Sequence, residues 1–327
     1  MRACIRSIEY HLPELVLSSA RLAEDFPDWP AEKIEAKTGI RERRIAGEGE
    51  CSSDLAVAAA RKLFAGGACA PETIDYVLLC TQTPDYFLPT TACLVQERLG
   101  IPTSAGALDF NLGCSGYVYG LSLAQGLIET GQARHVLLLT AETYSKFIDP
   151  RDKNVRTIFG DAAAATLVEG VEDGPPRGPT WIGPFIFGTD GAGAANLRVE
   201  SGGMRCRGAG SPHLHMNGPK IFEFTLRAVP QCVGELLKKS QKSAGEIDRF
   251  IFHQANEFML DHLRKKIGVP LERFSLAMRH CGNTVSASIP IAMKEDRDAG
   301  KFLPSDLAML VGFGVGYSWA ATLVRWP

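Results

Sequence analysis

Three polar residues far apart in the sequence stand where predicted secondary-structure elements meet. Cys114 follows a short apolar strand and a turn at Gly113, and it begins a helix that is apolar nearly all round. His253 lies between a strand and a helix, and Asn283 lies in a glycine turn before a helix of small residues. Elements that end in this way converge on one site in α/β folds. A cysteine with two hydrogen-bonding partners is a nucleophilic catalytic set, so the sequence predicts covalent catalysis by Cys114.

Each of the three residues has an ordinary structural explanation when it is taken alone. Free cysteines are mostly small core residues, histidines are common in cores and on surfaces, and asparagine is a common turn residue. The start of a helix, however, offers free backbone N–H groups and a dipole that favours an anion. We therefore expect the pKa of the Cys114 thiol to be lowered, which would supply a thiolate nucleophile.

Alternating apolar and turn-rich stretches predict an α/β fold. Strands are expected over residues 1–10, 74–80, 105–110, 135–140, 159–168, 248–253, 306–312 and 317–326. Helices are expected from Ser18, over 54–64 behind a Ser53 cap, over 91–99, from Cys114, and over 254–267. The turn-rich segment 172–179 separates an N-terminal half, 1–170, from a C-terminal half, 171–327. The two halves share a strand-then-helix order, which indicates an internal duplication.

Composition is that of an ordinary soluble globular protein. The chain has 327 residues, of which 45% are hydrophobic and 22% charged, and a net charge of -2. That charge gives no indication of nucleic-acid binding. No apolar run has the length of a membrane span, and the N-terminus does not resemble a signal peptide. Nine cysteines without a C-x-x-C pair argue against a disulfide framework and a zinc site, and for the cytoplasm.

Two further clusters leave their interpretation open. His213 and His215 are two residues apart, but the sequence offers no third ligand for a metal. The run from Thr38 to Arg44 contains three arginines and is predicted to be a charged turn. It could be a solvated loop that pairs with nearby carboxylates, or a contact for the phosphate groups of a large substrate.

Several motifs together resemble those of the β-ketoacyl-acyl-carrier-protein synthases III, members of the thiolase superfamily. These motifs surround Cys114, His253 and Asn283, and they include 38–43, 159–161 and 312–319. The resemblance covers nearly the whole chain, in order. It implies the duplicated thiolase fold, layered α-β-α-β-α, and a homodimer.

The resemblance also implies a reaction and roles for the three residues. Cys114 would take the acyl group from an acyl thioester, and malonyl carried on acyl carrier protein would then lose carbon dioxide. The resulting enolate would attack the acyl-cysteine, while the N–H of a neutral His253 and the amide of Asn283 stabilise the enolate oxygen. The backbone N–H groups of Cys114 and of the turn containing Val315 would stabilise the oxyanion of acyl transfer. No metal or other cofactor would be required.

Other residues are assigned by the same resemblance to the substrate and the carrier. Phe313, Val315 and Leu88 would line the oxyanion and acyl pocket, and Leu88 stands where the family often has a bulky phenylalanine, so a longer or branched acyl chain is expected. Substrate contacts are expected from four residues: Lys37, Lys153, Gly218 and Asn256. Pro219 replaces an asparagine that contacts pantetheine in the family. Arg264 and Lys265 would contact the carrier protein, unless these cations only stabilise a helix C-terminus.

Three other functions are alternatives to condensation. An acyltransferase of the same fold would move the acyl group to an oxygen or nitrogen acceptor, but such relatives tend to alter the asparagine that this chain keeps as Asn283. A papain-like hydrolase has the order Cys, His, Asn, but the surroundings of its cysteine are absent here. A non-enzymatic partner subunit would not be expected to retain Cys114, His253 and Asn283. Whether the acyl donor is coenzyme A or a carrier protein stays open.

Overall fold

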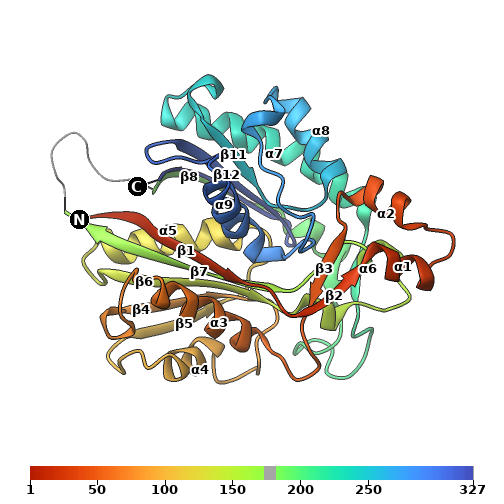
Figure 1. Cartoon of the computed structure of the whole chain (residues 1–327), viewed down its shortest axis with the longest axis horizontal. Helices are drawn as coiled ribbons and strands as arrows, with labels where there is room; N and C mark the ends of the chain where they lie inside the picture. The colour runs from red at the N-terminus through yellow and green to blue at the C-terminus, as the bar shows by residue number, and fades with distance from the viewer. Residues whose placement is uncertain (173–181, 327) are drawn as a thin grey trace.

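Two β-sheets carry the fold, and all strands of each sheet come from one half of the chain (Figure 1). The computed structural model describes residues 1–172 and 182–326, so most of the predicted linker, 172–179, lies outside the described residues. The order in the first sheet is β1 (Arg2–His11), β7 (Ala162–Val171), β6 (His135–Glu142), β4 (Tyr76–Cys80), β5 (Gly106–Phe110). The order in the second sheet is β11 (Arg249–Phe252), β12 (Leu307–Gly314), β13 (Ser318–Arg325), β8 (Ile182–Thr189).

The strand directions explain the sequence pattern of the strands. In the first sheet β5, β4 and β6 are parallel, and β7 and β1 continue it in antiparallel pairing. In the second sheet β11 pairs parallel with β12, and β13 and β8 follow in antiparallel pairing. Strands covered on both faces read as continuous apolar runs, as β4 and β6 do. Two short hairpins complete the strands: β2 (Leu15–Ser18) with β3 (Glu42–Ile45), and β9 (Leu197–Val199) with β10 (Leu214–Met216).

Helices form three layers around the two sheets, which gives the α-β-α-β-α arrangement of the thiolase fold (Figure 1). The central layer, between the sheets, contains α5 (Gly116–Glu129) and α9 (Ser288–Asp298). The outer face of the first sheet is covered by α3 (Ser52–Ala65) and α4 (Thr91–Arg98), and that of the second by α7 (Gly218–Ser240) and α8 (Glu257–Ile267). Three short helices lie to one side: α1 (Ser19–Asp25), α2 (Ala31–Thr38) and α6 (Lys153–Arg156). Within the described ranges, no helix combines the length and hydrophobicity needed to cross a membrane.

Most predicted elements are present, with shifted ends. Ser18 caps α1 as expected, and its hydroxyl accepts the N–H of Arg21 at 3.1 Å. The expected Ser53 cap of α3 is wrong: the N-cap is Cys51, whose N–H donates to Asp54 at 2.7 Å, while Ser53 bonds Asp85. The 23-residue helix α7 is an element that the sequence analysis did not predict.

One residue of the arginine-rich segment, Arg43, fits neither interpretation of that segment. Residues 42–45 form strand β3 rather than a turn, and Arg43 is completely buried. Its guanidinium donates to the carbonyl of Thr157 and to the Ser19 hydroxyl, each at 2.9 Å. Burial lowers the pKa of Arg43 to about 10. Arg43 therefore joins α1, β3 and the end of α6, and it is neither a solvated side chain nor a phosphate ligand.

Candidate active site

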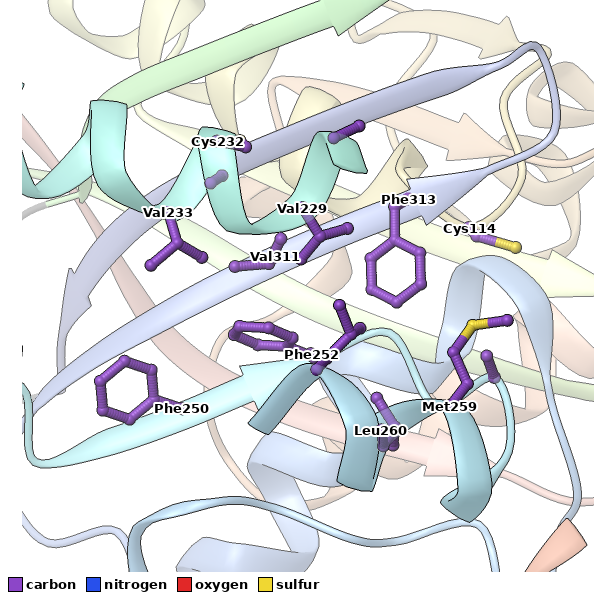
Figure 2. Packing of buried hydrophobic residues seen from close by; sticks show 14 of the residues in the cluster. Cys114, Val229, Cys232, Val233, Phe250, Phe252, Met259, Leu260, Val311 and Phe313 are labelled. Atoms are coloured by element: carbon purple, nitrogen blue, oxygen red, sulfur yellow. The ribbon is translucent and has the colours of Figure 1, made fainter. Parts of the chain in front are cut away.

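Cys114 lies in the tight turn that leads into α5, at the inner ends of both sheets. The N–H of Gly116 closes this turn on the carbonyl of Gly113 at 2.8 Å, and α5 begins at Gly116, two residues later than predicted. Figure 2 shows Cys114 beside the ring of Phe313, in a cluster of buried residues. Backbone N–H groups of Cys114 and Val315 donate to the sulfur. A Cβ atom on Gly314 would lie only 2.9 Å from Sγ of Cys114, so β12 approaches the sulfur closely because residue 314 is glycine.

The expected thiolate is not what the structure supports. Burial, followed by the nearby Glu142 carboxyl, raises the pKa of the Cys114 thiol to about 12, although the two backbone N–H groups act in the opposite direction. The helix terminus therefore does not outweigh desolvation. Cys114 rests as a thiol at neutral pH.

Glu142 is a buried residue of the site that the sequence analysis missed. Its carboxylate accepts the Ser286 hydroxyl at 2.8 Å and, at 3.1 Å each, the Gln82 N–H and the Thr83 hydroxyl. Burial raises its pKa to about 8. The signal in the sequence is an acidic residue at the end of an otherwise apolar strand, 135–142. Glu142 connects the first half of the chain to the segment that follows Asn283.

His253 follows β11, and its backbone N–H donates to the carbonyl of Val311 at 2.8 Å. The ring is buried, and burial lowers the pKa of His253 to about 3, so the imidazole is neutral at physiological pH. Its Nδ1 lies 2.7 Å from the Ser288 hydroxyl. The ring meets Phe313 edge to face, with 5.5 Å between ring centroids. Phe313 is thus adjacent to both His253 and Cys114.

Asn283 is held by backbone bonds to the segment that precedes β7. Its N–H donates to the carbonyl of Ile158 at 2.9 Å, and its carbonyl accepts the Gly160 N–H at 3.0 Å. The side-chain oxygen accepts the N–H of Val285 at 2.9 Å, which leaves the NH2 group as the donor end of the amide. Val285 has a φ of +53°, an uncommon conformation for a β-branched residue. The structure therefore brings Cys114 and His253 to Phe313, and it pairs the backbone of Asn283 with Phe159 of the same buried cluster.

Comparisons with known proteins identify the family of the chain. The family described as 3-Oxoacyl-[acyl-carrier-protein (ACP)] synthase III matches residues 108–178, and its C-terminal part matches residues 237–326. The beta-ketoacyl-[acyl-carrier-protein] synthase III of Symbiobacterium thermophilum is 38% identical over 321 residues, which is 96% of this chain and 95% of the relative. The chain belongs to the β-ketoacyl-acyl-carrier-protein synthase III family.

Crystal structures support the same conclusion. One 3-oxoacyl-(acyl-carrier-protein) synthase III is 54% identical, with a TM-score of 0.97 over all of both chains. The enzyme of Burkholderia xenovorans LB400 is 38% identical, with a TM-score of 0.93 over 100% of this chain and 94% of that one. The activity of this synthase III is the decarboxylative Claisen condensation of an acyl thioester with malonyl-acyl-carrier protein.

A large cavity reaches the turn at Val315 and Gly316. It has a volume of about 890 Å³, and both of these residues line it, whereas Cys114 itself is not a lining residue. Its apolar lining includes Tyr144, Phe147, Leu197 and Leu214. Leu88 and Phe313 were also expected in this pocket, but neither is a lining residue. Phe313 is buried beside it, and Leu88 is 82% exposed, whereas Tyr86 and Phe87 of the same loop do line the cavity.

Three lysines surround one tryptophan at the end of the synthase III that carries α2 and α6. The ammonium groups of Lys33, Lys37 and Lys153 lie 5.6, 5.2 and 5.4 Å from the ring centroid of Trp29. Lys153 also pairs with Asp28. Two predicted substrate residues, Lys37 and Lys153, are therefore brought together by the fold.

The other predicted contacts have different outcomes. Gly218 is the first residue of α7, and Asn256 caps α8, where its side chain accepts the Met259 N–H at 2.9 Å. Arg264 is an unsuitable carrier contact, because its guanidinium pairs with Asp261 at 2.6 Å and donates to the carbonyl of Val269 at 3.0 Å. Lys265 is 68% exposed, although it also pairs with Asp261. For Arg264, stabilisation of the helix end is the better explanation.

Proposed function

We propose that Cys114 carries the acyl group and that His253 and Asn283 stabilise the enolate during condensation. The observation that supports these roles best is that the neutral His253 imidazole and the buried Cys114 lie in one cluster around Phe313, while the oxygen end of the Asn283 amide is occupied by the Val285 N–H. A neutral imidazole can donate an N–H without adding a proton to the enolate. The first half-reaction is an acyl transfer to Cys114, and the N–H groups of Cys114 and Val315 suit its oxyanion. Each of these steps uses only donors and acceptors of the chain, so we propose that no cofactor is needed.

An experiment that separates the two half-reactions tests these roles. Cys114→Ser is expected to abolish acyl loading, measured as added mass after incubation with acyl thioesters, whereas Cys93→Ser, at an exposed cysteine, should load normally. Asn283→Ala should still load the acyl group but release carbon dioxide from malonyl-acyl-carrier protein at least about 100-fold more slowly, the usual cost of losing one oxyanion donor. Normal carbon dioxide release by Asn283→Ala would contradict the role of Asn283.

The acyl donor is proposed to be a coenzyme A thioester. The Trp29 ring and its three lysines combine a flat aromatic surface with cations, which suits a nucleotide that carries phosphates. The cavity beside Val315 is of the size that holds drug-sized ligands, far larger than an acetyl group. We therefore propose an acyl chain longer than acetyl. Lys265 is the proposed contact for the carrier protein.

A second copy of the chain is the proposed partner. Strand β5 ends the first sheet with one side unpaired in the described structure, and Leu108 on it is exposed. The loop before α4 exposes Tyr86, Phe87 and Leu88. Exposed sheet edges and apolar patches of this kind are usually covered. A homodimer through β5 would cover both features, and nine free cysteines fit a reducing cytoplasm.

A further inference from the structure

Ser288, the first residue of α9, contacts Nδ1 of the His253 ring. Its Oγ lies 2.7 Å from Nδ1 of His253, 2.9 Å from the carbonyl of Val285 and 3.3 Å from the N–H of Gln254. The side chain is buried. With Nδ1 occupied in this way, Nε2 is the nitrogen left for the substrates.

The groups around the Ser288 hydroxyl differ in the hydrogen bonds that they can form. The Gln254 N–H can only donate and the Val285 carbonyl can only accept, whereas the serine hydroxyl can do both. The carbonyl of Val285 also accepts the backbone N–H of Ser288, so it keeps a partner wherever the hydroxyl points. The carbonyl bonds the His253 ring as well. When Nδ1 carries a hydrogen, the hydroxyl can accept it and donate to Val285. When Nδ1 lacks one, the hydroxyl can turn and donate to Nδ1.

Only one of the two half-reactions needs a hydrogen on Nε2. In acylation, Sγ bonds to the acyl carbon, the bond from that carbon to the donor sulfur breaks, and the Cys114 proton passes to the leaving thiolate. In condensation, the bond between the malonyl carboxylate and the neighbouring carbon breaks, and carbon dioxide leaves. The electron pair of that bond forms an enolate, whose oxygen needs a hydrogen on Nε2. The enolate carbon then bonds to the acyl carbon, and Sγ leaves as a thiolate that takes a proton from water.

We propose that Ser288 is the positioning residue that lets His253 present a hydrogen on Nε2 to the enolate. Its hydroxyl can donate to Nδ1, which stabilises the neutral tautomer with the hydrogen on Nε2. Without the hydroxyl, Nδ1 faces only the acceptor carbonyl of Val285, which holds the hydrogen on Nδ1 and leaves Nε2 without one. The proposal rests on the proposed role of His253.

The test compares both half-reactions in Ser288→Ala. Carbon dioxide release from malonyl-acyl-carrier protein is expected to fall about tenfold or more, the scale of one hydrogen bond, while acyl loading of Cys114 changes less than about twofold. Ser288→Thr keeps the hydroxyl and should restore carbon dioxide release. Thr284→Val is the matched control, because the buried Thr284 hydroxyl has no partner among the described residues. Nitrogen-15 shifts of labelled histidine should show His253 of Ser288→Ala moving towards the tautomer with hydrogen on Nδ1.

Two outcomes overturn the proposal. Equal slowing of loading and carbon dioxide release in Ser288→Ala indicates a merely structural role, and an unchanged tautomer indicates that Ser288 does not control the ring. Asn283→Ala measured in parallel keeps the proposed function separate. If that variant releases carbon dioxide normally, the condensing roles themselves fail, whatever Ser288 does.

Discussion

At the scale of single residues, hydrogen-bond donors and desolvation shift the pKa of Cys114 in opposite directions. Two N–H groups reach the Cys114 sulfur, yet burial and Glu142 keep its thiol protonated. Burial acts on His253 in the opposite sense and keeps it neutral. Both effects follow from placing the site between two sheets, where charge is costly and hydrogen bonds are strong.

The raised pKa of Cys114 predicts how its reactivity depends on pH. Below a pKa of about 12, the thiolate fraction rises about tenfold for each pH unit. Alkylation of Cys114 by iodoacetamide, followed by peptide mass spectrometry, should therefore accelerate steadily from pH 7 to 9. A plateau reached below pH 8 would show instead that the helix start lowers the pKa of this thiol.

The lysines around Trp29 predict a loss specific to the nucleotide of the donor. Lys37→Ala and Lys153→Ala should each raise KM for acyl-coenzyme A by about three- to tenfold, the scale of one cation contact. KM for the matching acyl-pantetheine, which lacks the nucleotide, should not change. Steady-state kinetics with both donors checks this, and an equal rise in both KM values would refute a nucleotide site.

The residues of the site could be predicted from the sequence because each stands at an element junction. Cys114, His253 and Asn283 all lie at junctions between elements, although α5 begins two residues after Cys114 and α8 four residues after His253. The pKa of Cys114 could not be predicted, because it depends on burial and on Glu142, whose contacts come from segments near 82 and 286. Leu88 was misplaced for a similar reason: the direction of a loop side chain has no periodic signal.

At the scale of elements, continuous apolar runs were sufficient to predict most strands of both sheets. Helix α7 was not predicted, because glycine and proline are typical of turns and α7 has Gly218 and Pro219 at its start and Pro230 inside it. Its apolar face packs on the second sheet, and this packing outweighs the local preference of proline. The burial of Arg43 could not be predicted, because its guanidinium donates to the carbonyl of Thr157, which is distant in the sequence.

Arg43 predicts a large loss of stability from one substitution in this hairpin. Arg43→Met should lower the free energy of unfolding by about 2–3 kcal/mol, because it leaves the buried Thr157 carbonyl and Ser19 hydroxyl without their donors. Urea denaturation measures the change. Arg41→Met, at an exposed arginine of the same segment, is the control and should change stability by less than about 0.5 kcal/mol. Similar losses in both variants would contradict a specific bracing role for Arg43.

At the scale of the whole molecule, the central helix layer brings the two halves to one site. Cys114 precedes α5 from the first half, and Asn283 and Ser288 precede or begin α9 from the second. Both helices start at the same end of the layer, where Gly312 of β12 packs on the backbone of Cys114 and Ser115. Neither half contains the complete catalytic set.

The exposed edge of the first sheet predicts the oligomeric state. The synthase III should be a dimer in light scattering after size-exclusion chromatography, and Leu108→Glu on β5 should shift it to monomer. Leu271→Glu is the control, because Leu271 is more exposed than Leu108 but lies on a short helix after α8. A monomeric parent protein, or dissociation of both variants, would contradict an interface at β5.

The close approach of Gly314 to the sulfur limits how this enzyme could evolve resistance to an inhibitor that fills the space beside Cys114. Even an alanine at position 314 would place a methyl group 2.9 Å from Sγ, in the room that the acyl carbon would enter if Cys114 carries the acyl group as proposed. The methyl group would exclude the substrate from this space sterically. A compound that makes its closest contacts with the backbone at Gly314 would therefore face a target position that cannot change without loss of turnover.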